Sequence, residues 1–245
     1  MELATDAEGN YDLDGLRPGS YRLSAGGTTF FNQGGENAFG RVTRGGLRVE
    51  KDAWLSDIDL RLPTPGRLNV TVRDVAGEAV RNASVFVRDG EGRLSEAISF
   101  TMTDAMGQVE LGGIAPGEYT VSARAEGLAS HEEVPVRVTE GGVTEASLHL
   151  DQGTVLWLRF RDADGEQVKA QVSVRDNDGN EVSSMLSMSD IQVLYMEGAF
   201  SPTEHRLGPL PPGKYEVTAT ANGKTATKNV RLKGEPEKRI IVRIR

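Results

Sequence analysis

Three histidines could supply acid–base or metal-binding chemistry, but their spacing argues against both. His131, His149 and His205 lie far apart and occupy unrelated positions in the chain. They form neither an HExxH motif nor an i, i+4 pair, the arrangements that bring imidazoles onto one metal or beside one nucleophile. We therefore expect ordinary strand or surface histidines, no catalytic residue and no enzyme activity.

Two acidic segments, residues 162–166 and 176–181, carry carboxylates two residues apart, a spacing at which they can share a calcium ion. An EF-hand loop does not fit, because a loop glycine at Gly179 would place Val174 at the first ligand position. Asn-Asp-Gly also suits a hairpin position that needs a positive φ. We favour plain turns, with calcium as the alternative, and predict no cofactor.

Composition removes several other classes of function. The chain has no cysteine, which excludes disulfides, thiolate metal sites and cysteine nucleophiles. Its net charge of −8 opposes binding to nucleic acid or anionic lipid. It has no apolar run of about 18 residues, so we expect no membrane insertion.

A Pro-Gly-x-Tyr motif occurs three times and sets the organisation of the chain. Gly117 follows Gly19 by 98 residues, and Gly213 follows Gly117 by 96, which is the size of one small domain. We expect a type II turn with the glycine at positive φ. Recurrence of Tyr21, Tyr119 and Tyr215 predicts a packing role, with each hydroxyl hydrogen-bonded across a corner.

Between these motifs the pattern is that of short strands joined by tight turns. Leu68, Val70 and Val72 alternate with polar residues, as do six further segments up to Leu150, one of them at residues 98–102. No segment of useful length has helical periodicity. The predicted fold class is all-β: tandem seven-stranded antiparallel Greek-key sandwiches, the first one incomplete.

The repeat predicts three units. The first, residues 1–63, matches only the back half of the others and lacks about three N-terminal strands, so we expect the chain to be a fragment of a longer protein. The second, residues 66–150, is complete. The third, residues 153–245, has an inserted hairpin or loop near residues 183–206. Short linkers, one with two prolines, predict a semi-rigid row of units.

The second unit resembles the carboxypeptidase regulatory-like domain, within the wider transthyretin-like, Ig-like and Cna-B-like sandwich group. The resemblance rests on Thr103-Asp104-Ala105-x-Gly107, Ile114-Ala115-Pro116-Gly117-x-Tyr119, Ala125-Glu126-Gly127-Leu128 and Gly141-Gly142. It implies a noncatalytic module, often found in tandem on secreted or cell-surface bacterial proteins. The third unit lacks the first of these motifs and has Glu204-His205-Arg206 in that region.

Some Cna-B-type domains crosslink a lysine to an asparagine, aided by a buried acid. The resemblance would place that acid shortly after the Pro-Gly-x-Tyr strand. Here Glu216 follows the inward-facing Tyr215 directly, so alternation turns it outward. We do not expect the crosslink.

Two places are candidates for partner binding. Trp157 falls on the polar, outward face of its strand, where it would make a contact between domains or form a stacking platform. The insertion concentrates methionines and aromatics. It either covers its own domain or forms an apolar binding surface around Tyr195, Met196 and Phe200.

The function predicted is a noncatalytic spacer and interaction module of a bacterial secreted or cell-envelope protein, mediating protein–protein contact. The alternatives are a carbohydrate-binding module, or accessory domains of an enzyme encoded upstream. The partner is therefore a protein or a carbohydrate, with no nucleic acid and no membrane insertion.

Overall fold

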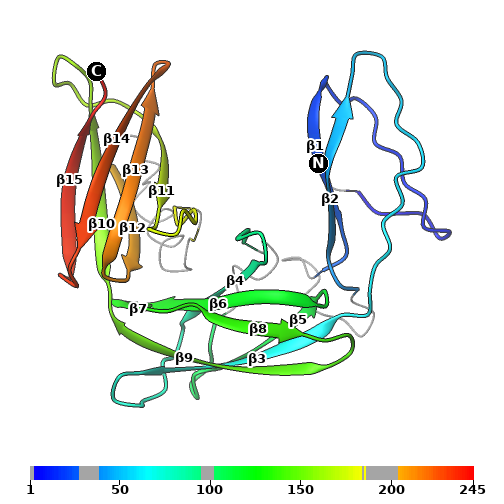
Figure 1. Ribbon diagram of the computed structural model, residues 1–245, viewed down its shortest axis with the longest axis horizontal. Coiled ribbons are helices and arrows are strands. Elements are labelled where there is room, and N and C mark those ends of the chain that lie inside the picture. Colours follow the sequence, from blue (N-terminus) through cyan, green and yellow to red (C-terminus); the bar gives the residue numbers. More distant parts are fainter. Residues whose placement is uncertain (1–2, 28–38, 95–101, 184, 186–203) are drawn as a thin grey trace.

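The described part of the chain folds into β-strands and loops. The computed structural model describes residues 3–27, 39–94, 102–183, 185 and 204–245, and these contain fifteen strands and no helix (Figure 1). None of these residues forms a helix that could cross a membrane. The strands are β1 Gly19–Ala25, β2 Val42–Val49, β3 Gly66–Asp74, β4 Ser84–Asp89, β5 Gln108–Ile114, β6 Gly117–Ala125, β7 Leu128–Ser130, β8 Val134–Val138, β9 Val143–Gln152, β10 Thr154–Arg161, β11 Gln171–Arg175, β12 Glu204–Leu210, β13 Gly213–Ala221, β14 Lys224–Leu232 and β15 Glu237–Arg243.

In the second unit, two groups of strands enclose one core. The central strand β3 pairs with β5 on one side and β9 on the other, while β6 pairs with β4 and β8. The short strand β7 pairs with both β6 and β9 and so links the two groups. Alternate residues of these strands point inward, and their apolar side chains pack together as Leu68, Val70, Val72, Val85, Val87, Leu111, Val121, Ala123, Val136 and Leu148.

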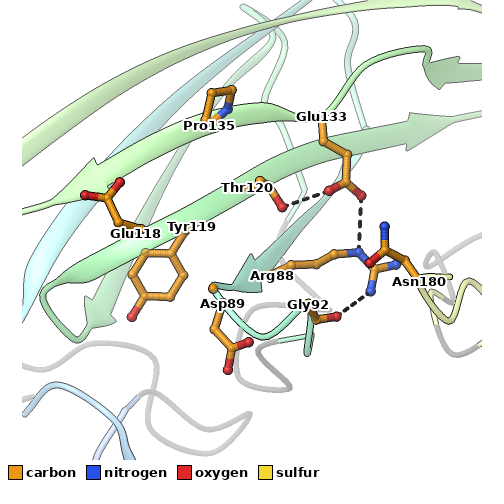
Figure 2. Close-up of a pocket in the computed structure, with 10 residues that line it drawn as sticks. Arg88, Asp89, Gly92, Glu118, Tyr119, Thr120, Glu133, Pro135 and Asn180 are labelled. Atoms are coloured by element: carbon orange, nitrogen blue, oxygen red, sulfur yellow. Dashed lines mark hydrogen bonds and ion pairs between the residues drawn. The ribbon is translucent and has the colours of Figure 1, made fainter. Parts of the chain in front are cut away.

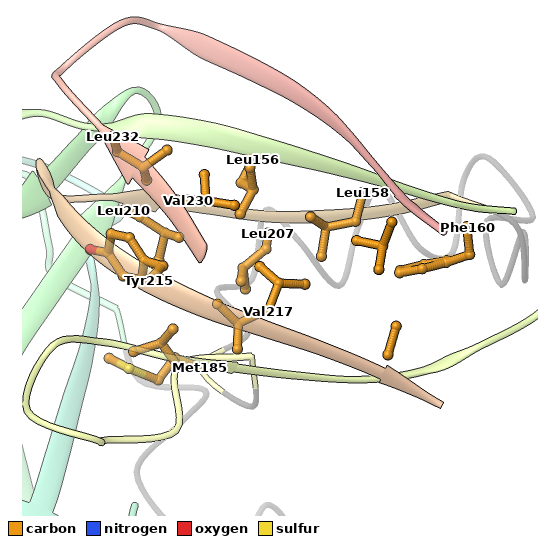
Figure 3. Close-up of a cluster of buried hydrophobic side chains, with 14 of the residues drawn as sticks. Leu156, Leu158, Phe160, Met185, Leu207, Leu210, Tyr215, Val217, Val230 and Leu232 are labelled. Carbon is orange, nitrogen blue, oxygen red and sulfur yellow. The ribbon is translucent and has the colours of Figure 1, made fainter. Parts of the chain in front are cut away.

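The third unit repeats this pairing scheme with six strands among its described residues. β10 lies between β12 and β15, and β13 lies between β11 and β14. The inward residues of these strands form a second core, part of which is drawn in Figure 3: Leu156, Leu158, Phe160, Leu207, Leu210, Tyr215, Val217, Val230 and Leu232.

The expectation of purely antiparallel sheets is wrong for one strand pair in each of these units. β3 pairs with β9 in parallel, and β10 pairs with β15 in parallel. The first and last strands of a unit thus lie side by side in the same direction. Residue alternation carries no information on strand direction, which is why the sequence pattern did not predict this.

The first unit contains much less regular structure. Among its described residues only β1 and β2 are strands, and they pair antiparallel with each other. Leu23 and Ala25 of β1 are half-buried, whereas the matching residues Val121 and Ala123 of β6 are 0% and 1% exposed. No hydrophobic side chain described in residues 3–64 is fully buried.

The Pro-Gly turn differs from the expectation. Gly117 and Gly213 begin strands and do not adopt a positive φ; the positive φ occurs earlier in the motif, at Gly113 and Gly208. The strand glycine lies beside the ring of the tyrosine. A Cβ on Gly117 or Gly213 would stand 3.4 Å from the ring of the tyrosine two residues later.

The tyrosine corner is confirmed in all three copies. The hydroxyls of Tyr21, Tyr119 and Tyr215 each donate to the carbonyl four residues earlier, at 2.6, 2.8 and 2.8 Å. Burial raises the pKa of Tyr215 to about 12, so this hydroxyl keeps its donor proton at neutral pH. The recurring motif is therefore a structural corner.

Two further segments that were singled out from the sequence are compared with the structure next. Glu204-His205-Arg206 does not replace the missing turn but begins β12. The strand predicted at residues 98–102 lies, except for Met102, outside the described residues; Met102 forms an isolated bridge with Ser84. The division into three units and the exact number of Greek-key sandwiches stay predictions.

The corner hydrogen bond predicts graded effects of removing the hydroxyl. Tyr215→Phe should lower the free energy of unfolding by about 1 kcal/mol, because a part-buried carbonyl loses its donor. Tyr21→Phe, at an exposed copy of the same bond, should change it by no more than about 0.5 kcal/mol. Urea titrations of both variants measure the difference; equal losses would contradict the burial argument.

Candidate interaction surface

The outward face of β4 and β6 in the second unit is covered by the third unit. Phe86 and Arg88 alternate with the inward Val85 and Val87, yet all four are at most 2% exposed. The side chain of Phe86 joins the core cluster of the third unit. This part of the sheet is therefore buried on both faces. We call the contact between its outward face, with Phe86 and Arg88, and the third unit the seam.

Arg88 is held at this seam by groups from both units. Its Nε lies 3.2 Å from Glu133, and Nη1 donates to the Gly92 carbonyl at 2.9 Å. Its Nη2 reaches across the seam to the carbonyl of Glu181 and to the sulfur of Met185, both at 2.8 Å. A buried guanidinium requires such partners, because its desolvation is costly.

Arg124 of β6 contacts the same methionine. It donates to the Met185 carbonyl at 2.9 Å and lies 3.5 Å from the Met185 sulfur. Its guanidinium also stands over the ring of Phe86, 5.4 Å from the ring centre. Two cations of the second unit therefore bind one residue of the third.

Glu181 supports this contact from within the third unit. Burial would raise the pKa of its carboxyl, but hydrogen bonds from Ser173 and Ser183 and from two backbone amides outweigh burial and hold that pKa below its usual range. The bonded carboxylate closes the turn between Arg175 and Glu181. It thereby fixes the carbonyl that Arg88 binds.

The chain between the two units adds a second constraint. β9 ends at Gln152 and β10 begins at Thr154, so Gly153 alone joins them. The Gly153 amide donates to the Gly127 carbonyl at 2.9 Å, and a Cβ on Gly153 would stand 2.7 Å from Pro209 and 3.1 Å from Ala129. The connection between these two units is therefore short and closely packed.

A pocket of about 350 Å³ opens beside the seam (Figure 2). Its polar groups are already engaged: Glu133 accepts from Thr120 as well as from Arg88, and Asp89 pairs with Arg93. Burial raises the pKa of the lining Tyr119. With its charges paired inside the protein, the pocket forms the edge of the seam and offers no grouped acid, base or nucleophile.

Trp157 lies on the outward face of β10, as alternation predicted. It pairs with Arg206 of β12 and Arg239 of β15, and the Arg239 guanidinium lies 5.6 Å from the ring centre. The indole nitrogen is buried without a hydrogen-bond partner in the described structure. Two residues further along β10, Arg159 forms an ion pair with Glu204 at 2.9 Å. The exposed Ile241 is the β15 partner of Arg159. We call Trp157, Arg159, Arg206, Arg239 and Ile241 the Trp157 surface.

Tyr195, Met196 and Phe200 lie outside the described residues. Met185, at the start of the insertion, is 3% exposed and packs in the core of its own unit as well as at the seam. The position of Met185 agrees with the interpretation in which the insertion packs against its own domain.

The histidines occupy separate environments. His131 contacts the Gln152 carbonyl at 3.3 Å, and His149 is exposed. His205 packs edge-on against Phe160, with 5.4 Å between the ring centres. Burial lowers the pKa of His205, and a hydrogen bond to the Ala170 backbone opposes this only in part.

The acidic turns use their carboxylates to hold backbone. In each, one aspartate oxygen accepts the amides two and four residues later, and a glycine three residues on takes a positive φ. The same turn recurs at Asp6, Asp74, Asp89, Asp104, Asp162 and Asp176. Across the described residues no three His, Asp or Glu side chains gather where they could hold a metal ion. Both acidic segments thus form turns of this repeated type.

The seam predicts a large cost for removing Arg88. Arg88→Ala should lower the free energy of unfolding by about 3 kcal/mol, since Glu133 and two carbonyls lose a buried cation. Arg137→Ala provides the control, because its ion pair with Glu118 is 78% and 70% exposed and is worth about 0–1 kcal/mol. Calorimetry of both variants tests this, and similar small losses would contradict it.

Burial of His205 predicts a pH effect of known sign. The unfolded chain binds the His205 proton near pH 6.5, roughly the unperturbed value, and the folded chain only at lower pH. Stability should therefore fall as pH drops through this range. His205→Gln should reduce the fall in melting temperature between about pH 7 and 5. An unaltered pH profile for His205→Gln would disprove the assignment.

Comparison with solved structures returns loose likenesses. The Bacillus anthracis TIE protein is 17% identical with a TM-score of 0.31, over 74% of this chain and 34% of that one. The major pilin subunit BcpA of Bacillus cereus (10%, TM-score 0.30) and the shaft pilin SpaA of Lactobacillus rhamnosus GG (10%, TM-score 0.31) match over 74% of this chain and 99% and 98% of theirs. The match thus covers about a third of the length of the TIE protein.

No curated protein matches the chain. The protein-family comparison matches the second unit. Its range contains almost all of β3 to β9, together with the Asp104 turn, the Tyr119 corner and the parallel closing strand. Residues 67–151 match the carboxypeptidase regulatory-like domain, as the sequence motifs predicted.

Proposed function

We propose that the chain is a noncatalytic spacer and interaction module of a bacterial secreted or cell-envelope protein, mediating protein–protein contact. The carboxypeptidase regulatory-like match supports a module that is noncatalytic. The described residues agree with this, since their histidines are dispersed and their turn aspartates hold backbone amides.

The observation that carries the proposal is the seam. Two buried guanidiniums and a one-residue connection set the second and third units at one spacing and orientation. An enzyme active site in a cleft would need open polar groups, whereas this junction uses its polar groups for rigidity. A rigid pair of units keeps its two ends at a fixed distance and holds its outer faces in a fixed direction. A spacer requires both.

The Trp157 surface is the contact face that we propose for a protein partner. It joins an aromatic ring, several arginines and an exposed isoleucine on one open sheet, and Trp and Arg are residue types enriched at protein interfaces. The carbohydrate alternative needs an open ring for stacking. Arg239 covers the ring of Trp157, which favours the protein partner.

Site-specific photo-crosslinking tests this proposal. A benzoylphenylalanine at Trp157 of the chain displayed on its producing cells should yield discrete crosslinked protein bands after irradiation. The same probe at Glu216, exposed on the opposite sheet of the same unit, is the control and should yield none.

Three results would overturn it: no crosslink at Trp157, equal crosslinking at both positions, or a glycan as the crosslinked species. Hydrolytic activity of the purified chain that is lost on a point substitution would also contradict the noncatalytic assignment.

A further inference from the structure

The outward face of the second unit's central strand carries a row of polar side chains whose charges are balanced. Across the sheet, Asn69 of β3 lies between Glu110 of β5 and Glu145 of β9. The Asn69 amide donates to the Glu145 carboxylate at 2.9 Å, and Glu110 pairs with Arg67 at 3.8 Å. The amide donor and both carboxylates of this row thus find partners within the sheet, so the fold itself requires no excess charge here.

The third unit reverses the charge of the same row. Its central strand β10 has Trp157 at the position of Asn69, and the residues on either side are Arg206 of β12 and Arg239 of β15. Two guanidiniums therefore stand where the second unit has two carboxylates. The Trp157 Nε1–H is buried and has no acceptor in the described structure. The row has kept a hydrogen-bond donor and lost the carboxylate that satisfies it in the second unit.

A second row of this face has two further cations. Arg161 of β10 pairs with Arg243 of β15, where the second unit pairs Arg73 with a histidine. Arg161 donates to the Gly165 carbonyl at 2.6 Å, and neither Arg161 nor Arg243 has an ion pair within the described residues. Like charges directly opposite each other destabilise a sheet. An anion bound between the two guanidiniums would remove this repulsion.

The spacing of the two cationic rows defines what fits them. Trp157 and Arg161 are four residues apart on β10, about 13 Å at the strand rise of roughly 3.3 Å per residue. Midway between them, Arg159 is neutralised by Glu204, and its β15 neighbour Ile241 is exposed. The face therefore presents a cation, an apolar side chain and a cation at every second residue. An extended chain with two acidic residues four positions apart and an apolar residue midway is complementary to it.

These cations belong to a basic region of an acidic chain. Residues 224–245 contain eight lysines and arginines and two glutamates, a net charge of +6, whereas the whole chain has −8. The other residues together carry −14. Most of the chain therefore repels an acidic ligand, while this end of the third unit attracts it.

We propose that the partner of the Trp157 surface is a protein that binds through an acidic extended segment. One carboxylate of that segment accepts from the Trp157 Nε1–H and pairs with Arg239. An apolar side chain packs on Ile241, and a second carboxylate binds between Arg161 and Arg243. This inference rests on the proposed function and adds to it the chemistry of the partner.

The first of these contacts has an internal precedent in the second unit, where Glu145 accepts from the donor of the row. In the third unit the partner supplies the carboxylate instead. Arg239 covers the indole, but its side chain is 65% exposed and its ion pair with Glu237 is 3.5 Å long, so it is able to turn toward an incoming carboxylate. Hydrogen bonds to an ionised acceptor are about twice as strong as those between neutral groups.

The probe is the peptide Ser-Glu-Ser-Leu-Ser-Glu-Ser with blocked ends, whose glutamates are four residues apart. It is titrated into the isotope-labelled full chain while the indole N–H signals of Trp54 and Trp157 are followed by NMR, with Trp54→Phe to assign them. The Trp157 signal should move downfield and saturate, because its N–H gains a carboxylate acceptor. The signal of Trp54, which lies in the first unit, should stay in place.

Matched ligands separate the charge from its spacing. One peptide has glutamine at both glutamate positions, and another has the same composition with the two glutamates adjacent. Each should bind about tenfold or more weakly, because it loses at least one charge-assisted contact. Inorganic phosphate, a simple anion, should leave the Trp157 signal in place.

Three variants test the assigned residues. Arg239→Glu restores the carboxylate that the second unit has at this position, so the Trp157 signal should lie downfield without peptide and the peptide response should be lost. Arg243→Gln should weaken peptide binding about fivefold or more, because the second carboxylate loses a cation. Lys214→Gln, which removes the same charge from the opposite sheet of this unit, should leave binding unchanged.

The proposal is overturned if no peptide moves the Trp157 signal, or if the glutamine peptide or phosphate moves it as the glutamate peptide does. Equal effects of Lys214→Gln and Arg243→Gln would also overturn it. Self-association that moves the signal without peptide would assign the carboxylate to a second copy instead. A protein crosslinked at Trp157 in the absence of peptide binding would leave the proposed function standing and remove only the acidic segment.

Discussion

The central strand is the constraint on which this architecture depends. A strand that pairs on both edges satisfies the backbone groups of two neighbours at once, and here it also supplies three fully buried side chains to the core. Where β3 or β10 is present, the neighbouring segments are regular and their apolar residues are buried. Among residues 3–27 and 39–64 no strand takes this position, the matching segments are irregular, and their alternating apolar residues are half-buried. A central strand with pairing on both edges thus goes together with regular neighbours and a buried core.

At the seam, buried polar side chains set the orientation of two units. A pair of unpaired guanidiniums between two sheets would cost several kcal/mol each. At Arg88 this cost is offset by a carboxylate, two carbonyls and a thioether, and at Arg124 by the Met185 carbonyl and the face of Phe86. Such directional bonds fix orientation more strictly than apolar contact does, because each donor has one geometry in which it is satisfied. The second and third units are thereby oriented as a pair.

Much of the fold could be predicted from local pattern. Alternation in residues such as Leu68, Val70 and Val72 predicts strands, Asp-x-x-Gly predicts the turns, and the recurrence of Tyr119 predicts a corner. Parallel pairing of β3 with β9 could not be predicted, since alternation is the same for either direction. The positive φ predicted for Gly117 was wrong, because this glycine already lies in β6 and the positive φ falls at Gly113.

Among candidate site residues, Trp157 was placed correctly on the outward face, because alternation fixes facing. Arg88 and Arg124 were missed. Their burial depends on a partner unit, and sequence pattern shows only which face a residue occupies, not what covers that face. One signal was available: Phe86 on the same outward face as Arg88 marks a face too apolar to be left in water.

Amide hydrogen exchange on the free full-length chain tests the central-strand account most directly. Residues 108–114 and 143–152 flank the central strand β3, so their amides should exchange slowly. Residues 10–16 and 54–62, which the repeat places at the matching positions, form no strand and should exchange rapidly in the same molecule. Equal protection of the two sets would show that the first unit is already complete and would contradict the account.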